Sequence, residues 1–330
     1  MYVVENKNTR PQFNLALEEH LCLRAMNDGS RFFMLWQNEP SIIVGRFQNT
    51  IEEIDAPFIR ERGIHVVRRN SGGGAVYHDL GNVNYSFIVP DSGNFDFALF
   101  TGPIIRILAA LGVEAESSGR NDISIEGKKI SGGAQFRRNG VTLHHGTLLY
   151  DSDLEILSQA LRPPDDKFQS KAVKSVRSRV GNIKPHLPEP LSAREFQERL
   201  TSGINDLAIW ELQTWTPDVT ALDETERLAR EKYSEWEWNY GESPSFTERK
   251  KMRFSWGGAE VLLLIDEGRI TGCSFYGDYF GNGDYSPLLS RLTGVPYTGE
   301  GVADALTGFD PGEIFAGSKL EDITALLVPE

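Results

Sequence analysis

The sequence has little cysteine and no long hydrophobic run. Cys22 and Cys273 are the two cysteines among 330 residues. They lie too far apart in sequence to build a disulfide framework or a multi-cysteine metal site, so we expect reduced thiols in a cytosolic protein. The longest aliphatic run, 261–265, is far shorter than the ~20 residues of a membrane-spanning helix. Residues 1–10 show neither an apolar signal core nor an arginine-rich transit pattern, which favours a cytoplasmic protein without a membrane segment.

Positive charge is also scarce. Lys and Arg number 34 against 47 Asp and Glu, which gives a net charge of -13. Because phosphate backbones require a basic face, nucleic acid is not an expected partner. Residues 162–184 differ, with seven basic and two acidic side chains and a net charge of +5. A solvated charged face is the usual explanation of such a run, and a clamp for polyphosphate or for an acidic protein partner is the alternative.

Length and composition predict two domains. A chain of 330 residues exceeds the roughly 100–200 residues typical of one domain, and its 40% hydrophobic content is that of a globular protein. The segment 243–245, after the aromatic stretch 236–240, marks the expected boundary, so we predict domains at 1–243 and 244–330. The second should be a small α+β accessory domain, and its residues 245–330 carry a net charge of -6.

The hydrophobic pattern predicts an α+β fold with a mixed, largely antiparallel sheet flanked by helices, and not a uniform βαβ winding. We expect Asn14 to cap the first helix and Gly63 to end the second. A capping box at Ser192 should start the last helix, and Asn139 should begin a hairpin turn. The expected helices cover residues 15–26, 51–62, 97–111 and 193–207. The expected strands cover residues 31–36, 41–45, 64–68, 83–89, 123–127, 129–135 and 141–150.

The most informative run is Arg-Arg-Asn-Ser-Gly-Gly-Gly-Ala-Val-Tyr-His-Asp-Leu-Gly-Asn at 68–82. Three consecutive glycines expose backbone N–H groups and lack the β-carbons that would block a ligand. Arg68 and Arg69 precede them, where planar guanidinium groups could hold a carboxylate or a phosphate. A surface glycine loop beside a strand remains the alternative. The spacing fits neither Gly-x-x-x-x-Gly-Lys-Ser/Thr nor Gly-x-Gly-x-x-Gly.

A second run, 119–134, places polar side chains around the start of a strand. Asn121 and Asp122 offer oxygen ligands of the kind that magnesium prefers. Lys129 begins the strand and could reach a phosphate that lies over it. Lys128 is better explained as a solvated lysine at a hairpin turn. This run therefore adds a possible phosphate and magnesium site to the glycine-rich loop.

Together these runs resemble the lipoate–protein ligase A family in its bacterial two-domain form. The pattern at 68–82 looks like the signature loop of that family. The other matching segments follow in the family's order, and they are 119–123, 129–132, 144–149, 174–180, 236–241 and 253–258. The resemblance covers nearly the whole chain and weakens after about residue 285. It implies a biotin/lipoate protein ligase-like catalytic domain followed by an accessory domain.

The resemblance also implies a two-step reaction. Lipoate and MgATP would give lipoyl-adenylate and pyrophosphate. The lipoyl group would then pass to a lysine amine of an acceptor domain, such as those of 2-oxoacid dehydrogenase complexes or the glycine-cleavage H protein. We expect a monomer, with a hinge near residues 241–244 that lets the accessory domain swing between the two steps.

Carried over position by position, the resemblance assigns roles to individual residues. Lys129 would be the catalytic lysine, whose charge stabilises the pentavalent phosphorus transition state. ATP or adenylate contacts are implied for Arg69, Gly72, Gly73, Gly74, Ala75, Val76, Tyr77, Asn82, Asn121, Asp122 and Lys129. Lipoate contacts are implied for Leu17, Trp36, Arg69, Gly74, His78, Ser131, Gly132, Ala134, His145 and Gly146. Asp122 would hold magnesium. Phe136, followed by Arg137 and Arg138, replaces an exposed arginine of some family members, so contacts of that site are not transferred.

Three other functions share part of this pattern. An octanoyl- or lipoyl-transferase would work through a thioester and need a cysteine in the acyl pocket, but Cys22 falls in the first helix and Cys273 in the accessory domain. A biotin ligase would carry a Gly-Arg-Gly-Arg-x-Gly-type loop, which the sequence lacks. A non-catalytic lipoate-binding module would be favoured if Lys129 were missing. His144 and His145 have no third ligand at metal spacing, so zinc is not expected.

Overall fold

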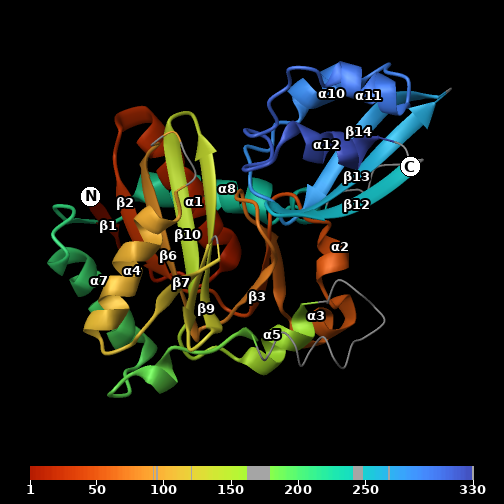
Figure 1. Cartoon of the computed structure of the whole chain (residues 1–330). Helices are drawn as coiled ribbons and strands as arrows, with labels where there is room; N and C mark the ends of the chain where they lie inside the picture. The colour runs from red at the N-terminus through yellow and green to blue at the C-terminus, as the bar shows by residue number, and fades with distance from the viewer. Residues whose placement is uncertain are drawn as a thin grey trace.

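The computed structural model describes residues 1–91, 93, 96–119, 121–161, 179–240, 248–266 and 268–328. They form a larger lobe, up to residue 240, and a smaller accessory lobe, from residue 248 (Figure 1). The expected domain boundary and most of the basic run 162–184 lie outside the described residues. None of the described helices is both long and apolar enough to cross a membrane.

The larger lobe is built on one eight-stranded sheet. From β2 to β7 every neighbouring pair is antiparallel, and β1 runs parallel to both of its neighbours. The predicted mixed, largely antiparallel sheet is therefore confirmed. In spatial order the strands are β11 (Gln213–Trp215), β1 (Tyr2–Val4), β2 (Phe32–Trp36), β6 (Asn82–Pro90), β10 (Val141–Leu149), β9 (Lys128–Arg138), β8 (Asp122–Ile125) and β7 (Glu116–Ser118).

Helices cover both faces of this sheet (Figure 1). Successive side chains of a strand point to opposite faces, so Phe33 and Leu35 of β2 pack on one side while Phe32 and Met34 pack on the other. The helices of the first side are α4 (Ala98–Ala110) and α7 (Ala193–Asp206). Those of the second side are α1 (Pro11–Asp28), α8 (Val219–Leu228) and the π-helical turn η3 (Ala229–Tyr233).

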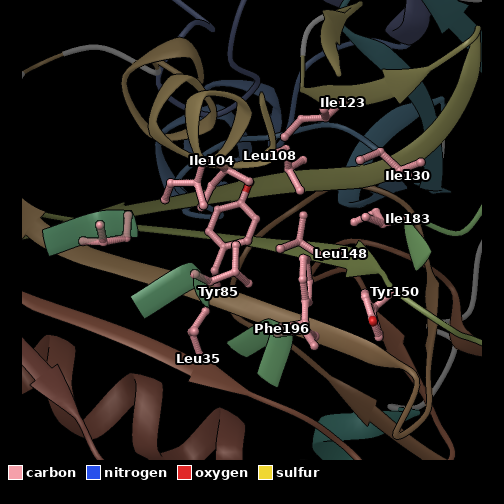
Figure 2. Packing of buried hydrophobic residues seen from close by; sticks show 14 of the residues in the cluster. Leu35, Tyr85, Ile104, Leu108, Ile123, Ile130, Leu148, Tyr150, Ile183 and Phe196 are labelled. Atoms are coloured by element: carbon pink, nitrogen blue, oxygen red, sulfur yellow. The ribbon is translucent and has the colours of Figure 1, made fainter. Parts of the chain in front are cut away.

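The core under α4 holds the central strands in place. Figure 2 shows Ile104 and Leu108 of α4 facing Tyr85 and Leu148 of the sheet. All four side chains are fully buried. A fully buried aliphatic side chain contributes roughly 1.5–3 kcal/mol through removal of its surface from water. This packing stabilises β6, β9 and β10, which carry Asn82, Lys129 and His145.

A second, three-stranded sheet lies beside the first. Its central strand β3 (Ser41–Val44) runs parallel to β4 (His65–Arg68) and antiparallel to β5 (Val76–His78). The end of β4 and the start of β5 therefore meet at the same end of β3, and the glycine-rich loop 69–75 joins them there. The remaining helical segments of the larger lobe are α2 (Thr50–Glu53), α3 (Ala56–Arg62), α5 (Leu154–Ala160), η2 (Lys184–His186) and α9 (Trp236–Asn239).

The start of α1 differs from the prediction. Asn14 does not cap this helix, because Arg10 takes the N-cap position and Pro11 fills the first turn. Asn14 is instead buried inside the helix, where its amide donates to Gln37 O and Asn38 Oδ1, both at 2.9 Å. Proline is favoured in the first helical turn because its missing N–H has no partner there. The sequence pattern thus started the helix four residues late.

Other local signals give a mixed outcome. The helix expected at 51–62 is split into α2 and α3, because Ile54 leaves the helix and forms a β-bridge. Gly63 ends α3 with a φ of 62°, in the left-handed region that suits glycine. The capping box at Ser192 is present, and Asn139 has the positive φ of 49° that a tight hairpin turn requires.

The accessory lobe has the α+β character that we predicted. Its antiparallel strands are β12 (Glu248–Phe254), β13 (Gly257–Asp266) and β14 (Arg269–Gly277), and its helices are α10 (Ser286–Leu292), α11 (Gly299–Ala305) and α12 (Leu320–Leu327). It has a hydrophobic core of its own. The loop after β14 reaches the larger lobe, where the Tyr279 ring stacks on Phe47 with ring centres 4.9 Å apart.

Candidate active site

A cavity lies between α1, the three-stranded sheet and strands β6, β9 and β10. The structure brings together thirteen residues to which the sequence analysis gave a role, and they are Trp36, Arg69, Gly73, Gly74, Ala75, Val76, His78, Asn121, Lys129, Gly132, Ala134, His145 and Gly146. The wall also contains five residues without an expected role, and they are Leu15, Ile43, Asn84, Gly133 and Thr147. Segments that are far apart in the chain thus meet in one place.

Leu17 and Tyr77 were expected in the pocket wall, but both side chains lie elsewhere. Leu17 is fully buried in the core beneath the sheet, and Leu15 of the same helix lines the cavity instead. Tyr77 packs in a separate cluster under the three-stranded sheet. Its neighbours Val76 and His78 line the cavity because alternate residues of β5 point to opposite faces.

Two further positions lie behind the wall. Asn82 is buried and does not line the cavity, but its amide donates to Asn84 Oδ1 at 2.8 Å, and Asn84 does line it. Gly72 faces the accessory lobe, since a β-carbon there would come 2.1 Å from Tyr279 O. The next N–H group, that of Gly73, donates to the same carbonyl at 3.0 Å. Part of the glycine-rich loop therefore accommodates the accessory lobe.

A β-bulge aims Lys129 at the cavity. Ile123 pairs with Ser131 and Ser124 pairs with Lys129, so Ile130 is an extra residue in β9. A bulge re-aims neighbouring side chains, and here it leaves Ile130 in the core while Lys129 reaches the cavity wall. Ser131, expected beside lipoate, pairs opposite the core residue Ile123 and lies buried behind the wall.

Asp122 is the ionic partner of Lys129. The Lys129 Nζ lies 2.8 Å from Asp122 Oδ1, and both side chains are only partly buried. A β-carbon at Gly132 would come 2.8 Å from the same Nζ, so the lysine crosses the strand where glycine leaves room. Asn121 donates its amide to Gly133 O at 2.8 Å. Within the described residues, no three or more His, Cys, Asp or Glu side chains gather as metal ligands.

Arg68 has a structural role, contrary to the expectation that it could bind an anion. Its Nη1 donates to Gly45 O at 2.9 Å and to Gln48 O at 2.7 Å, and its Nη2 donates to Thr50 Oγ1 at 2.6 Å. The Nε group donates to Trp238 O at 2.9 Å. Burial lowers the pKa of Arg68 to about 10. This guanidinium therefore ties β4 to the loop after β3 and to α9, outside the cavity wall.

Arg69, by contrast, lines the cavity and organises the glycine-rich loop. Its Nη2 donates to Gly72 O at 2.6 Å and to Gly74 O at 2.8 Å. Its Nη1 donates to Ile43 O at 3.0 Å, and its Nε donates to Ser71 Oγ at 3.0 Å. Burial lowers the pKa of Arg69 to about 10, so the side chain stays cationic at neutral pH. The loop is thus folded around a buried positive charge at the cavity wall.

Sequence reasoning missed Glu18, a buried carboxylate on α1. Both of its oxygens lie 3.0 Å from His145 Nδ1, and Oε1 accepts a hydrogen bond from Ser86 Oγ at 2.5 Å. The Ser86 oxygen in turn accepts from Trp36 Nε1 at 2.8 Å. His145 Nε2 lies 2.6 Å from Ser71 Oγ. The available signal was an acidic residue next to Leu17 and one turn before Leu21 and Cys22, on the buried side of α1.

His78 is a neutral part of the wall. Its Nδ1 lies 3.0 Å from Asn38 Nδ2 and 3.4 Å from Asn84 Nδ2, and amide nitrogens can only donate to it. Burial, reinforced by the positive charge of Arg69 and by His145, lowers the pKa of His78 to about 3. The imidazole therefore carries no charge at neutral pH.

The two cysteines lie away from the cavity. Cys22 is buried in the core beneath α1, and Cys273 is on β14 of the accessory lobe. Burial raises the pKa of Cys22 well above its ordinary value and that of Cys273 to about 12, which keeps both thiols protonated and unreactive. A thioester route through either sulfur is therefore disfavoured in this arrangement.

Comparisons with known proteins identify the family of this chain. The family model of the lipoyl protein ligase A/B catalytic domain matches residues 10–205, and that of the bacterial lipoate protein ligase C-terminus matches residues 243–327. The chain is 41% identical to lipoate-protein ligase LplJ of Bacillus subtilis, covering 99% of this chain and 100% of that protein.

The chain is also similar to solved structures. The structure of P. falciparum LipL1 in complex with lipoate has a TM-score of 0.82 at 24% identity, covers 100% of this chain and 99% of that chain, and shows the shared fold. Lipoate-protein ligase A bound with ATP has a TM-score of 0.64 at 27% identity and covers 73% of this chain and 98% of that chain. The chain therefore belongs to the lipoate–protein ligase family.

Proposed function

We propose that this protein activates lipoate with MgATP and passes the lipoyl group to a lysine amine of an acceptor lipoyl domain. Acceptors of this kind are the E2 subunits of 2-oxoacid dehydrogenases and the glycine-cleavage H protein. The observation that carries the proposal is the placement of Lys129 in the same cavity wall as Arg69 and the glycine-rich loop. A cation, a glycine-rich loop and an apolar slot at one site suit an acid that must be joined to a phosphate.

In the first step, the acyl tail lies along the apolar side of the wall, formed by Leu15, Trp36 and Ala134. The carboxylate of lipoate attacks the α-phosphorus of ATP, the bond to pyrophosphate breaks, and lipoyl-adenylate forms. Lys129 contributes its positive charge to the phosphorus centre as negative charge builds up there. Arg69 keeps the glycine-rich loop in the shape that receives the carboxylate end.

Asp122 fits a magnesium ion that enters as MgATP. Magnesium keeps several waters and is usually held by one or two carboxylates together with substrate phosphates. Asp122 is partly exposed next to Lys129, which suits that arrangement. Asn121 lies beside it in the cavity wall. These residues would therefore hold the metal-phosphate side of the nucleotide.

In the second step, the acceptor lysine amine attacks the lipoyl carbonyl, AMP leaves, and the amine loses a proton to give the amide. No protein nucleophile is needed because the mixed anhydride is already activated. We propose an acidic acceptor that docks near the basic run 162–184, and a monomeric, cytoplasmic enzyme that does not use nucleic acid as a partner. The net charge of +5 in that run supports the choice of an acidic partner.

The test is ATP–pyrophosphate exchange that depends on lipoate. We expect Lys129→Ala to lower this exchange about 100- to 1,000-fold, as found when one transition-state donor is removed. Lys128→Ala is the matched control, because Lys128 is the exposed neighbour at the start of β9 and should leave exchange unchanged. Exchange that survives in Lys129→Ala would refute the role proposed for this lysine.

A further inference from the structure

A buried chain of hydrogen bonds connects Glu18 on α1 with Arg69 in the glycine-rich loop. The carboxylate of Glu18 contacts His145 Nδ1 at 3.0 Å, and His145 Nε2 contacts Ser71 Oγ at 2.6 Å. Ser71 Oγ also accepts from Arg69 Nε at 3.0 Å. No step of the reaction proposed above uses Glu18 or Ser71, so the chain requires an explanation of its own.

The two ends of this chain carry opposite charges in a region without water access. Glu18 is 2% exposed, Ser71 is fully buried, and Arg69 is 5% exposed. A buried charge is strongly unfavourable unless it is paired and hydrogen-bonded. His145 and Ser71 lie between the Glu18 carboxylate and the Arg69 guanidinium, so these two charges are connected through hydrogen bonds of the intervening groups. The charges of Glu18 and Arg69 are therefore stabilised by each other only while His145 and Ser71 stay in place between them.

The proton positions in this chain of hydrogen bonds follow from the Glu18 end. A carboxylate only accepts hydrogen bonds, so His145 must carry its proton on Nδ1, where it faces Glu18. When the imidazole is neutral, its opposite nitrogen accepts from the Ser71 hydroxyl, whose oxygen remains free to accept from Arg69. Glu18 thereby selects the tautomer of His145, as second-layer carboxylates do for ligand histidines.

The geometry is similar to that of a serine, histidine and acid group in nucleophilic catalysis, but Ser71 is badly placed for that role. Its side chain is fully buried and is absent from the cavity wall. Its oxygen already accepts a hydrogen bond from Arg69. Ser71 is therefore a link between two other groups and not an attacking group.

We infer that Glu18 is a positioning residue for lipoate activation. It fixes His145, His145 fixes Ser71, and Ser71 holds Arg69 in the rotamer that closes the glycine-rich loop around the carboxylate end of the substrate. Both nitrogens of His145 are engaged, so the ring presents carbon atoms to the acyl slot. This inference rests on the proposed function, because it gives Glu18 a part in the same adenylation step.

The test is a double-mutant cycle read by lipoate-dependent exchange. Glu18→Gln should lower kcat/KM for lipoate about 10- to 100-fold, the range expected for hydrogen bonds to charged groups. Ser71→Ala should also lower it, by about 10-fold, and the double variant should be no worse than the poorer single variant, because the residues act as one unit. Multiplying effects would overturn the inference.

Glu224→Gln is the matched control. Glu224 of α8 lies 3.4 Å from Nδ1 of His20, and His20 is on α1 like Glu18. The Glu224 side chain is 52% exposed. This variant removes a carboxylate from a histidine without touching the cavity, and exchange should be unchanged. An effect of Glu18→Gln no larger than that of the control would contradict the inference.

Other outcomes separate the possible failures. If Glu18→Gln does not fold, Ser71→Ala alone decides, and an unchanged kcat/KM for lipoate in that variant overturns the inference. If Ser71→Ala abolishes transfer while an acyl ester is trapped on Ser71 of the wild-type protein, the serine is a nucleophile and the positioning role is wrong. If the wild-type protein shows no lipoate-dependent exchange, the proposed function itself has failed.

Discussion

At the scale of single residues, two adjacent arginines take unrelated roles. Arg68 satisfies backbone and hydroxyl acceptors outside the cavity, while Arg69 lines the cavity and folds the glycine-rich loop. Consecutive side chains at the end of β4 point to opposite sides, and pairing with β3 fixes which side each arginine takes. Sequence alone placed both arginines next to the glycines but could not separate the two, because their acceptors come from distant segments such as Trp238.

His78 gives a prediction for stability against pH. Its pKa is about 3 in the folded protein, mainly through burial, while an exposed histidine titrates near pH 6.5. Below pH 6.5 the unfolded chain takes up a proton that folded His78 does not, so stability is full above pH 6.5 and is lost as the pH falls towards 3. At pH 5 the loss from this group is about 2 kcal/mol.

Denaturant unfolding at pH 7.5 and pH 5 measures this effect. His144 is also buried with its pKa well below the ordinary value, so the wild-type protein should lose more stability than His78 alone explains. His78→Gln should reduce the difference between the two pH values by about 2 kcal/mol. An identical pH dependence in the variant and the wild-type protein would show that His78 is not buried in its neutral form.

Much of the site could be predicted at the residue scale, because its members sit in short runs with unusual composition. Thirteen of the residues given a role line one cavity. Leu17, Ser131 and Tyr77 lie outside this cavity wall, since one step along a helix or strand turns a side chain to another face. Glu18 was missed because its partner His145 is distant in sequence and comes next to it only through packing of α1 on β10.

At the scale of elements, a single extra residue in β9 decides where the key lysine points. In β8, Ile123 and Ser124 are consecutive, but their partners in β9, Ser131 and Lys129, are two residues apart. The extra residue between these partners is Ile130, which forms the bulge. The sequence predicted a strand starting near Lys129, and the structure has β9 at Lys128–Arg138. The bulge itself left no signal in the hydrophobic pattern, because its cause is pairing with the neighbouring strand β8.

The contact between the glycine-rich loop and the accessory lobe gives a second prediction. A β-carbon at Gly72 would lie 2.1 Å from Tyr279 O, so Gly72→Ala must push the loop after β14 away. We expect the free energy of unfolding to fall by about 1–3 kcal/mol, as is typical when an atom is forced into packed structure. The accessory lobe should also become easier to cleave by a protease.

Gly74→Ala is the control for this change. A β-carbon at Gly74 meets no atom within 4 Å, so stability and protease resistance should match those of the wild-type protein. Equal stability of Gly72→Ala and Gly74→Ala would show that the loop after β14 does not rest on the glycine-rich loop in solution.

At the scale of the whole molecule, the two lobes meet beside the cavity. Phe280 of the accessory lobe packs with Phe97 and Ala134, and Ala134 also lines the cavity. The accessory part was predicted as a small α+β domain, and its loop after β14 contacts the proposed active site. Contacts between lobes could not be predicted, because they depend on how two separately folded units dock.

The distribution of charge suits this arrangement. Residues 245–330 carry -6 of the net charge of -13. The cavity wall holds Arg69 and Lys129, whose positive charges suit a carboxylate and phosphates. A hinge near residues 241–244 stays a hypothesis, because that segment lies outside the described residues. Closely similar lobe positions with and without bound lipoyl-adenylate would count against it.

The central claim is that lipoate is activated by ATP and transferred without a covalent protein intermediate. The most direct measurement is the intact mass of an apo lipoyl domain after incubation with the protein, lipoate and MgATP. We expect the wild-type protein and Cys22→Ser alike to add one lipoyl group to the acceptor, and to add none when ATP is left out. Transfer from an acyl thioester donor without ATP, lost in Cys22→Ser, would contradict the claim.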